Sequence, residues 1–120
     1  MNKTILIVDD EPDLVELVGE MLARAGCVIL KAGSGEEALR VLAENKPDLI
    51  IADITMPDMG GLELAQKIRA DARLAKTPML LLSGMINEDH EASGLQEGDF
   101  YMSKPVSNSK LLQKVKDILG

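Results

Sequence analysis

The chain has 120 residues, of which 46% are apolar, and a formal net charge of -7, which suits one globular domain with one core. An acidic chain of this kind argues against non-specific nucleic-acid binding, and no apolar run is long enough to span a bilayer. No signal-peptide pattern follows Met1, so we expect a cytoplasmic protein without direct nucleic-acid or membrane partners.

Short apolar runs alternate with amphipathic stretches along the chain. These patterns predict strands at residues 4–8, 28–32, 49–53, 78–83 and 100–103. They predict helices at residues 12–25, 36–44, 61–70, 88–96 and 107–119. The alternation indicates an α/β fold in one domain over residues 1–120. We expect a doubly wound, flavodoxin-like, five-stranded parallel sheet of order 2-1-3-4-5 with helices on both faces.

The first predicted helix has clear start and stop signals. Pro12 suits its first turn, and Gly26 suits its end. Its apolar residues are spaced three and four apart and are expected to face the core: Leu14, Leu17, Val18, Met21, Leu22 and Ala25. Cys27, the only cysteine, follows this helix and is interpreted as a small buried apolar residue rather than a catalytic thiol.

Polar residues stand at the ends of the predicted strands. Asp9 and Asp10 follow the first strand, and Asp53 ends the third. Ser83 ends the fourth strand, and Lys104 follows the fifth. Because ligands bind outside the carboxyl ends of parallel strands, we expect these side chains to meet at one edge of the sheet.

This set of residue types predicts a metal-assisted phosphoryl site. Three neighbouring carboxylates are unfavourable without a cation, and Mg²⁺ prefers carboxylate oxygens. Asp53 is the expected nucleophile because it alone ends a central strand, while Asp9 and Asp10 would hold the metal. Lys104 would supply positive charge opposite the phosphoryl oxygens, and Ser83 would donate a hydrogen bond to them.

Four segments form a specific pattern through their order and spacing. They are ILIVDDEP at residues 5–12, GEEAL at 35–39, PDLIIADITMP at 47–57 and YMSKP at 101–105. With these segments the chain resembles, over its whole length, the receiver domain of two-component response regulators. Among these it is most similar to the stand-alone, chemotaxis-regulator-like kind. The resemblance implies that residues 1–120 form a single receiver domain.

The resemblance implies a role for each residue of the acidic edge. Asp53 would be the phospho-acceptor, and Asp9 and Asp10 would be the acidic pair that binds Mg²⁺. Thr55, two residues after Asp53, would offer its backbone carbonyl to the metal, and Lys104 would bind the phosphate. The phosphoryl donor would be a sensor histidine kinase or a phosphotransfer protein, and the domain would be a signalling switch rather than an enzyme.

The resemblance also implies how the switch works. Ser83 would be the switch hydroxyl and Tyr101 the switch aromatic residue, with the Lys104–Pro105 bond in the cis form. On phosphorylation Ser83 would move toward the phosphate, and Tyr101 would fill the space that it leaves. The face built from the fourth helix, the fifth strand and the fifth helix would then change, and a downstream protein would read that change.

The chain departs from the family pattern at two places. The family often reads Met-Pro-x-Met-Asp-Gly where this chain has Asp58-Met59-Gly60-Gly61 after its Met-Pro, so we expect the helix at 61–70 to start without a side-chain cap. Phe100 stands next to the switch position, which affects the shape of the expected output face.

Two functions of other classes are alternatives. A metal-dependent phosphohydrolase with an aspartyl-phosphate intermediate would use the same carboxylates. Hydrolases of the haloacid-dehalogenase type, however, have a second Asp two residues after the nucleophile, where this chain has Thr55. A phosphorylation-independent interaction module would need neither the complete acidic set nor Lys104.

Overall fold

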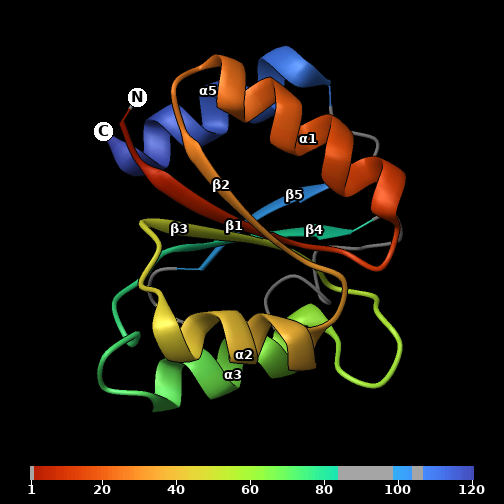
Figure 1. The fold of residues 1–120 in the computed structure, drawn as a ribbon, viewed down its shortest axis with the longest axis vertical. Coiled ribbons are helices and arrows are strands. Elements are labelled where there is room, and N and C mark those ends of the chain that lie inside the picture. The colour runs from red at the N-terminus through yellow and green to blue at the C-terminus, as the bar shows by residue number, and fades with distance from the viewer. Residues whose placement is uncertain (1, 84–98, 104–106) are drawn as a thin grey trace.

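The computed structural model describes residues 2–83, 99–103 and 107–120 (Figure 1). Its strands are parallel and form one sheet of order β2-β1-β3-β4-β5, with β1 at Thr4–Val8, β2 at Val28–Ala32, β3 at Leu49–Asp53, β4 at Met79–Ser83 and β5 at Asp99–Ser103. The helices in the described ranges are α1 at Pro12–Arg24, α2 at Gly35–Glu44, α3 at Gly61–Ala70 and α5 at Asn108–Leu119. The predicted α/β fold and strand order are confirmed, and the helix predicted at 88–96 lies outside the described residues.

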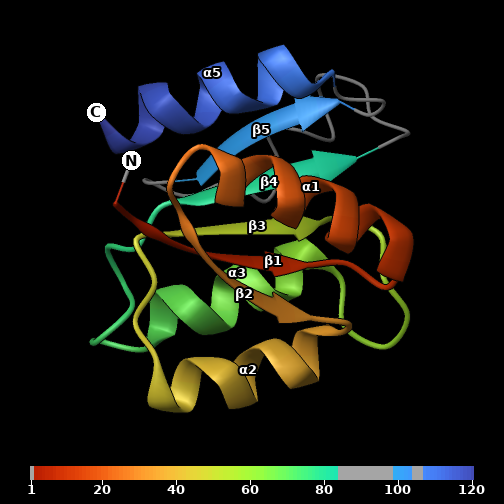
Figure 2. The same ribbon diagram turned by 45° about the horizontal axis from the view of Figure 1, so that its top comes forward.

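The sheet is covered by helices on both faces. Helices α1 and α5 lie over one face and α2 and α3 over the other (Figures 1 and 2). Successive side chains of a strand point to opposite faces, so Leu6 and Val8 pack toward α2 and α3 while Ile5 and Ile7 pack toward α1 and α5. Strand β3 is buried along its whole length, which explains its uninterrupted apolar run. None of the helices within the described ranges is long and apolar enough to cross a bilayer.

The expected buried stripe of α1 is wrong at one position. Leu17 is 55% exposed, whereas Val15, Val18 and Leu22 are buried. Successive helical residues turn by about 100°, so Leu17 lies about 200° around the helix axis from Val15 and cannot share its buried side. The apolar face predicted from the three-and-four spacing is therefore wider than the face of α1 that packs against the sheet.

The end of α1 has the form that Gly26 predicts. Gly26 adopts a left-handed backbone conformation with φ 94°, and its N–H donates to the carbonyl of Ala23 at 3.0 Å. The Cys27 N–H donates to the carbonyl of Leu22 at 3.1 Å, which completes a Schellman motif. Cys27 is 7% exposed, as expected for a structural residue, and burial raises the pKa of its thiol.

Candidate functional site

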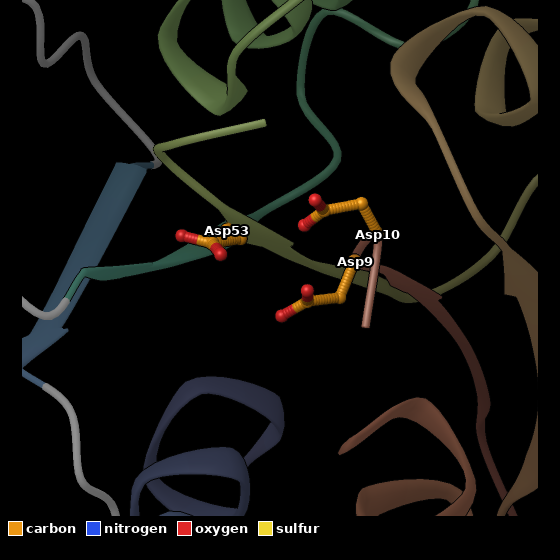
Figure 3. A group of neighbouring side chains, drawn as sticks. All are labelled: Asp9, Asp10 and Asp53. Carbon is orange, nitrogen blue, oxygen red and sulfur yellow. The ribbon is translucent and has the colours of Figure 1, made fainter. Parts of the chain in front are cut away.

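An acidic cluster lies at the carboxyl edge of the sheet. Strands β1 and β3 are neighbours and pair Val8 with Ala52, so the residues that follow these partners, Asp9 and Asp53, come close together. One carboxylate oxygen from each of Asp9, Asp10 and Asp53 lies within 4.8 Å of the others. Figure 3 shows the side chains of Asp9 and Asp10 leaving the end of β1 and extending toward Asp53. The structure therefore brings together the three carboxylates that the sequence singled out.

Backbone groups hold the two buried carboxylates of this cluster. Asp9 is 3% exposed and Asp53 is 6% exposed, while Asp10 faces solvent. Oδ1 of Asp9 accepts the Glu11 N–H at 3.0 Å, and Oδ1 of Asp53 accepts the Thr55 N–H at 3.1 Å. Each bond joins a carboxylate to the N–H two residues later, a turn that Asp favours and that fixes its side chain. These two backbone hydrogen bonds thus orient the buried carboxylates.

The donor set fits a small divalent cation. Three like charges at this separation disfavour one another, and a cation between them removes that penalty. Carboxylate oxygens are the ligands that Mg²⁺ prefers, and this ion usually keeps several waters and binds phosphate oxygens in addition. Because Asp10 is exposed, the cluster opens to solvent on one side, where waters or a phosphoryl group can reach the ion.

The other predicted site residues fall into two groups. Thr55 is exposed and lies two residues after the end of β3, and Tyr101 on β5 is partly buried against the core between the sheet and α2 and α3. Ser83 ends β4, but its side chain lies outside the described part of the structure. Lys104 and the predicted cis bond to Pro105 also lie outside the described residues. The described residues thus include the predicted metal ligands Asp9, Asp10, Asp53 and Thr55. The role of Lys104 in phosphate binding stays a prediction from the sequence.

The loop between β3 and α3 follows the acidic cluster directly. The N-cap residue of α3, Gly60, provides no side-chain cap, as the sequence departure predicted. Backbone hydrogen bonds hold this start: the Gly61 N–H donates to the carbonyl of Ile54 at 3.0 Å, and the Ile54 N–H donates to Leu82 of β4 at 2.8 Å. The loop is therefore tied to the sheet despite the missing cap.

A depression beside Asp9 and Asp10 contains one basic residue that the sequence analysis did not select. Lys31 lines this depression together with Glu16 and Glu37. Its ammonium group donates to the Glu16 carboxylate at 2.7 Å. Lys31 thus forms an ion pair with Glu16 at the rim of the site. Nothing in the sequence around Lys31 predicted that it would lie near Asp9 and Asp10.

Known proteins with similar sequences identify the family of this chain. Residues 5–116 match the response regulator receiver domain family. The chain is 31% identical over 121 residues to the polar-differentiation response regulator DivK of Brucella ovis, covering 100% of this chain and 98% of that protein. It is 37% identical over 120 residues to the phosphate regulon transcriptional regulatory protein PhoB of Pseudomonas aeruginosa, covering 99% of this chain and 52% of that protein.

Solved structures with a similar fold also include response regulators. The chemotaxis protein CheY4 of Vibrio cholerae superposes with a TM-score of 0.93 at 28% identity, covering 99% of this chain and 100% of the other. The chain spans about half the length of PhoB and of the Bacillus subtilis regulator PhoP, 52% and 49% respectively. Because the family match extends over nearly the whole chain, the chain belongs to the response regulator receiver domain family of two-component signalling.

Proposed function

We propose that residues 1–120 form a receiver domain that accepts a phosphoryl group on Asp53 in the cytoplasm and switches a partner-binding face. The convergence of Asp9, Asp10 and Asp53 within 4.8 Å supports this proposal most directly. Close like charges cost stability, so their presence at the ligand-binding edge of the sheet favours a functional role over a structural one. The family membership supports the same chemistry.

The metal ligands in this proposal are the three carboxylates and the backbone carbonyl of Thr55. Mg²⁺, when bound, supplies charge neutralisation for the carboxylates and for the phosphoryl oxygens. The Thr55 N–H already binds Oδ1 of Asp53 at 3.1 Å, so the residue proposed to complete the ligand set is in contact with the phospho-acceptor. Asp10, which is exposed, contributes the ligand at the solvent side.

The transfer step is an in-line displacement at phosphorus. A carboxylate oxygen of Asp53 forms a bond to the phosphorus, and the bond from phosphorus to the imidazole nitrogen of a phosphohistidine breaks. The electron pair of that bond stays on the nitrogen, and the product is an acyl phosphate on Asp53. The donor is a sensor histidine kinase or a phosphotransfer protein. Lys104 and Ser83 contact the phosphoryl oxygens.

The readout is a change on the face that includes β5 and α5. Tyr101 moves into space that Ser83 vacates, which links the new charge on Asp53 to strand β5. Tyr101 is partly buried and packed against the core, so a change in its environment is transmitted to neighbouring side chains. A downstream protein binds this face, and the domain acts as a switch rather than as an enzyme of repeated turnover.

Mass spectrometry of the intact protein after treatment with acetyl phosphate and Mg²⁺ tests the proposal. Wild type should gain one phosphoryl group, and Asp53→Asn should gain none. Asp58→Asn is the matched control, since Asp58 is an exposed carboxylate of the following loop and Asn tolerates its left-handed backbone with φ 67°. This control should be phosphorylated like wild type, and chelation of the metal should abolish the reaction in both.

Three results would contradict the proposal. A phosphoryl adduct on Asp53→Asn would place the acceptor elsewhere. No adduct on wild type in the presence of Mg²⁺ would favour a phosphorylation-independent interaction module. Rapid repeated hydrolysis of small phosphate esters without a kinase would favour a phosphohydrolase.

A further inference from the structure

A close contact joins the start of α2 to the loop between β3 and α3. Gly35, the first residue of α2, is buried, and the side chain of Met59 lies against it. A Cβ atom on Gly35 would lie 2.7 Å from Sδ, 2.9 Å from Cγ and 3.0 Å from Cβ of Met59. Three such short contacts on one side chain mean that any residue larger than glycine at position 35 displaces Met59.

The backbone beside Met59 is in a strained conformation. Asp58 has φ 67°, and the N–H of Met59 donates to the carbonyl of Pro57 at 2.7 Å, which closes a three-residue turn around Asp58. A non-glycine residue rarely adopts the left-handed region, and it persists there only when its surroundings hold it. The Met59 side chain, partly buried against the core beneath α2 and α3, is the apolar contact next to this turn.

The other end of the same loop lies directly against the acidic site. A Cβ atom on Gly61 would lie 2.5 Å from the carbonyl oxygen of Asp53, and one on Gly60 would lie 2.5 Å from that of Ile54. The loop therefore returns to the backbone of the proposed phospho-acceptor with no space left between them. Thr55 and Met59 both lie within this closed loop, and the Thr55 N–H donates to Oδ1 of Asp53 at 3.1 Å.

We propose that Gly35 and Met59 are positioning residues for the acidic site. Because Gly35 has no side chain, the side chain of Met59 can pack against it. This contact stabilises the strained turn at Asp58 and so keeps Thr55 in position beside Asp53. The consequence for Mg²⁺ affinity rests on the proposed function, whereas the consequence for the loop in the metal-free protein does not. The short contacts of Gly35 are all with the side chain of Met59, so we expect their effect on the acidic site to pass through the loop backbone.

Nuclear magnetic resonance of the metal-free protein tests the first consequence. Gly35→Ala should move the backbone amide resonances of Met59 and Thr55. Gly33→Ala is the matched control two residues earlier, where a Cβ atom meets only Oε2 of Glu37 at 3.6 Å, an ordinary contact. This control should leave the Thr55 resonance in place. Met59→Ala removes atoms instead of adding them, so it tests the contact even if Gly35→Ala folds poorly.

A titration with Mg²⁺ alone, followed by the same resonances, tests the second consequence. Gly35→Ala and Met59→Ala should each raise the Kd for Mg²⁺ about tenfold, at the low end of what loss of support behind a metal ligand causes. The double variant Gly35→Ala/Met59→Ala should bind Mg²⁺ as Met59→Ala does, because the added methyl group then has no side chain to displace.

The outcomes separate this inference from the proposed function. If Gly35→Ala lowers the free energy of unfolding but leaves the Thr55 resonance and the Kd as in wild type, the contact is only structural and the inference is wrong. If the double variant loses affinity by the product of the two single losses, the two residues act independently and the inference is also wrong. If wild type binds no Mg²⁺, the proposed function fails, and the metal-free resonances still decide whether the contact positions the loop.

Discussion

The two faces of the sheet are both closed by a pair of helices, but they are connected differently to the acidic site. Under α2 and α3 the core includes Met56, which is buried, and receives Met59, both from the loop that follows Asp53. Under α1 and α5 the core is built from strand and helix residues and Cys27, and a groove lined by Leu17, Met21 and Leu112 separates the two helices. On the proposed function, burial on the first face also positions the loop that contains Thr55, whereas the core of the second face includes no residue of that loop.

Truncation of one fully buried leucine on each face is the test with the largest expected effect. Leu64 in α3 and Leu22 in α1 are both 0% exposed. Leu64→Ala and Leu22→Ala should each lower the free energy of unfolding by about 2 to 5 kcal/mol, because each leaves a cavity in a packed core. Urea denaturation measures this loss. A loss below about 1 kcal/mol for either variant would show that its site collapses around the missing atoms.

Addition of Mg²⁺ sharpens the comparison, because only one of the two faces is expected to respond. Wild type should gain about 2.7 kcal/mol of unfolding free energy at a free Mg²⁺ concentration 100-fold above its Kd. Leu22→Ala should keep this gain. Leu64→Ala should gain less at the same concentration, since the Leu64 side chain belongs to the core that Met56 and Met59, from the loop that contains Thr55, also enter. Equal gains in the two variants would contradict the distinction between the faces.

Two arginines, Arg73 and Arg24, are expected to differ in how much each contributes to the free energy of unfolding. Both contributions are smaller than those of the buried leucines. Arg73 donates to the carbonyls of Leu42 and Asn45 and so satisfies the end of α2, while Arg24 of α1 makes an exposed ion pair with Glu20 at 3.5 Å. Arg73→Ala should cost about 1 kcal/mol of unfolding free energy, since two carbonyls lose a charged donor. Arg24→Ala should cost less than about 0.5 kcal/mol, because exposed ion pairs contribute little. Thermal unfolding of both variants checks the order.

The alkylation rate of the Cys27 thiol measures how well the core under α1 and α5 is closed. Of the effects predicted here, this one involves the smallest change in the stability of the fold. Burial raises the pKa of Cys27, so less thiolate is present at neutral pH and iodoacetamide should react at least about tenfold more slowly than in urea. Because the folded protein holds this proton more tightly, the resulting stability is present below the ordinary thiol pKa. It is lost as the pH rises from that value to the raised one. Equal alkylation rates in native and urea-unfolded protein would contradict this account.

Much of the fold and the acidic part of the site could be predicted because these features are local in the sequence. Strand β3 is a continuous apolar run that ends on Asp53, and the βα alternation predicts a parallel sheet, for which 2-1-3-4-5 is a common doubly wound order. Leu17 was misplaced because helical spacing alone does not state how wide a face the sheet covers. The contact of Gly35 with Met59 could not be predicted, since two residues 24 positions apart meet only after the chain has folded.

The sequence by itself determined the alternation of strands and helices, the residues at the strand ends and the turn at Gly26, because each depends on periodicity or on the conformational range of one residue. The tertiary structure alone decided the distances among Asp9, Asp10 and Asp53 and the closure of the loop against Asp53. The physical reason is that a separation between carboxylates, or the space left beside a glycine, depends on how neighbouring strands and helices pack, and no local pattern encodes it.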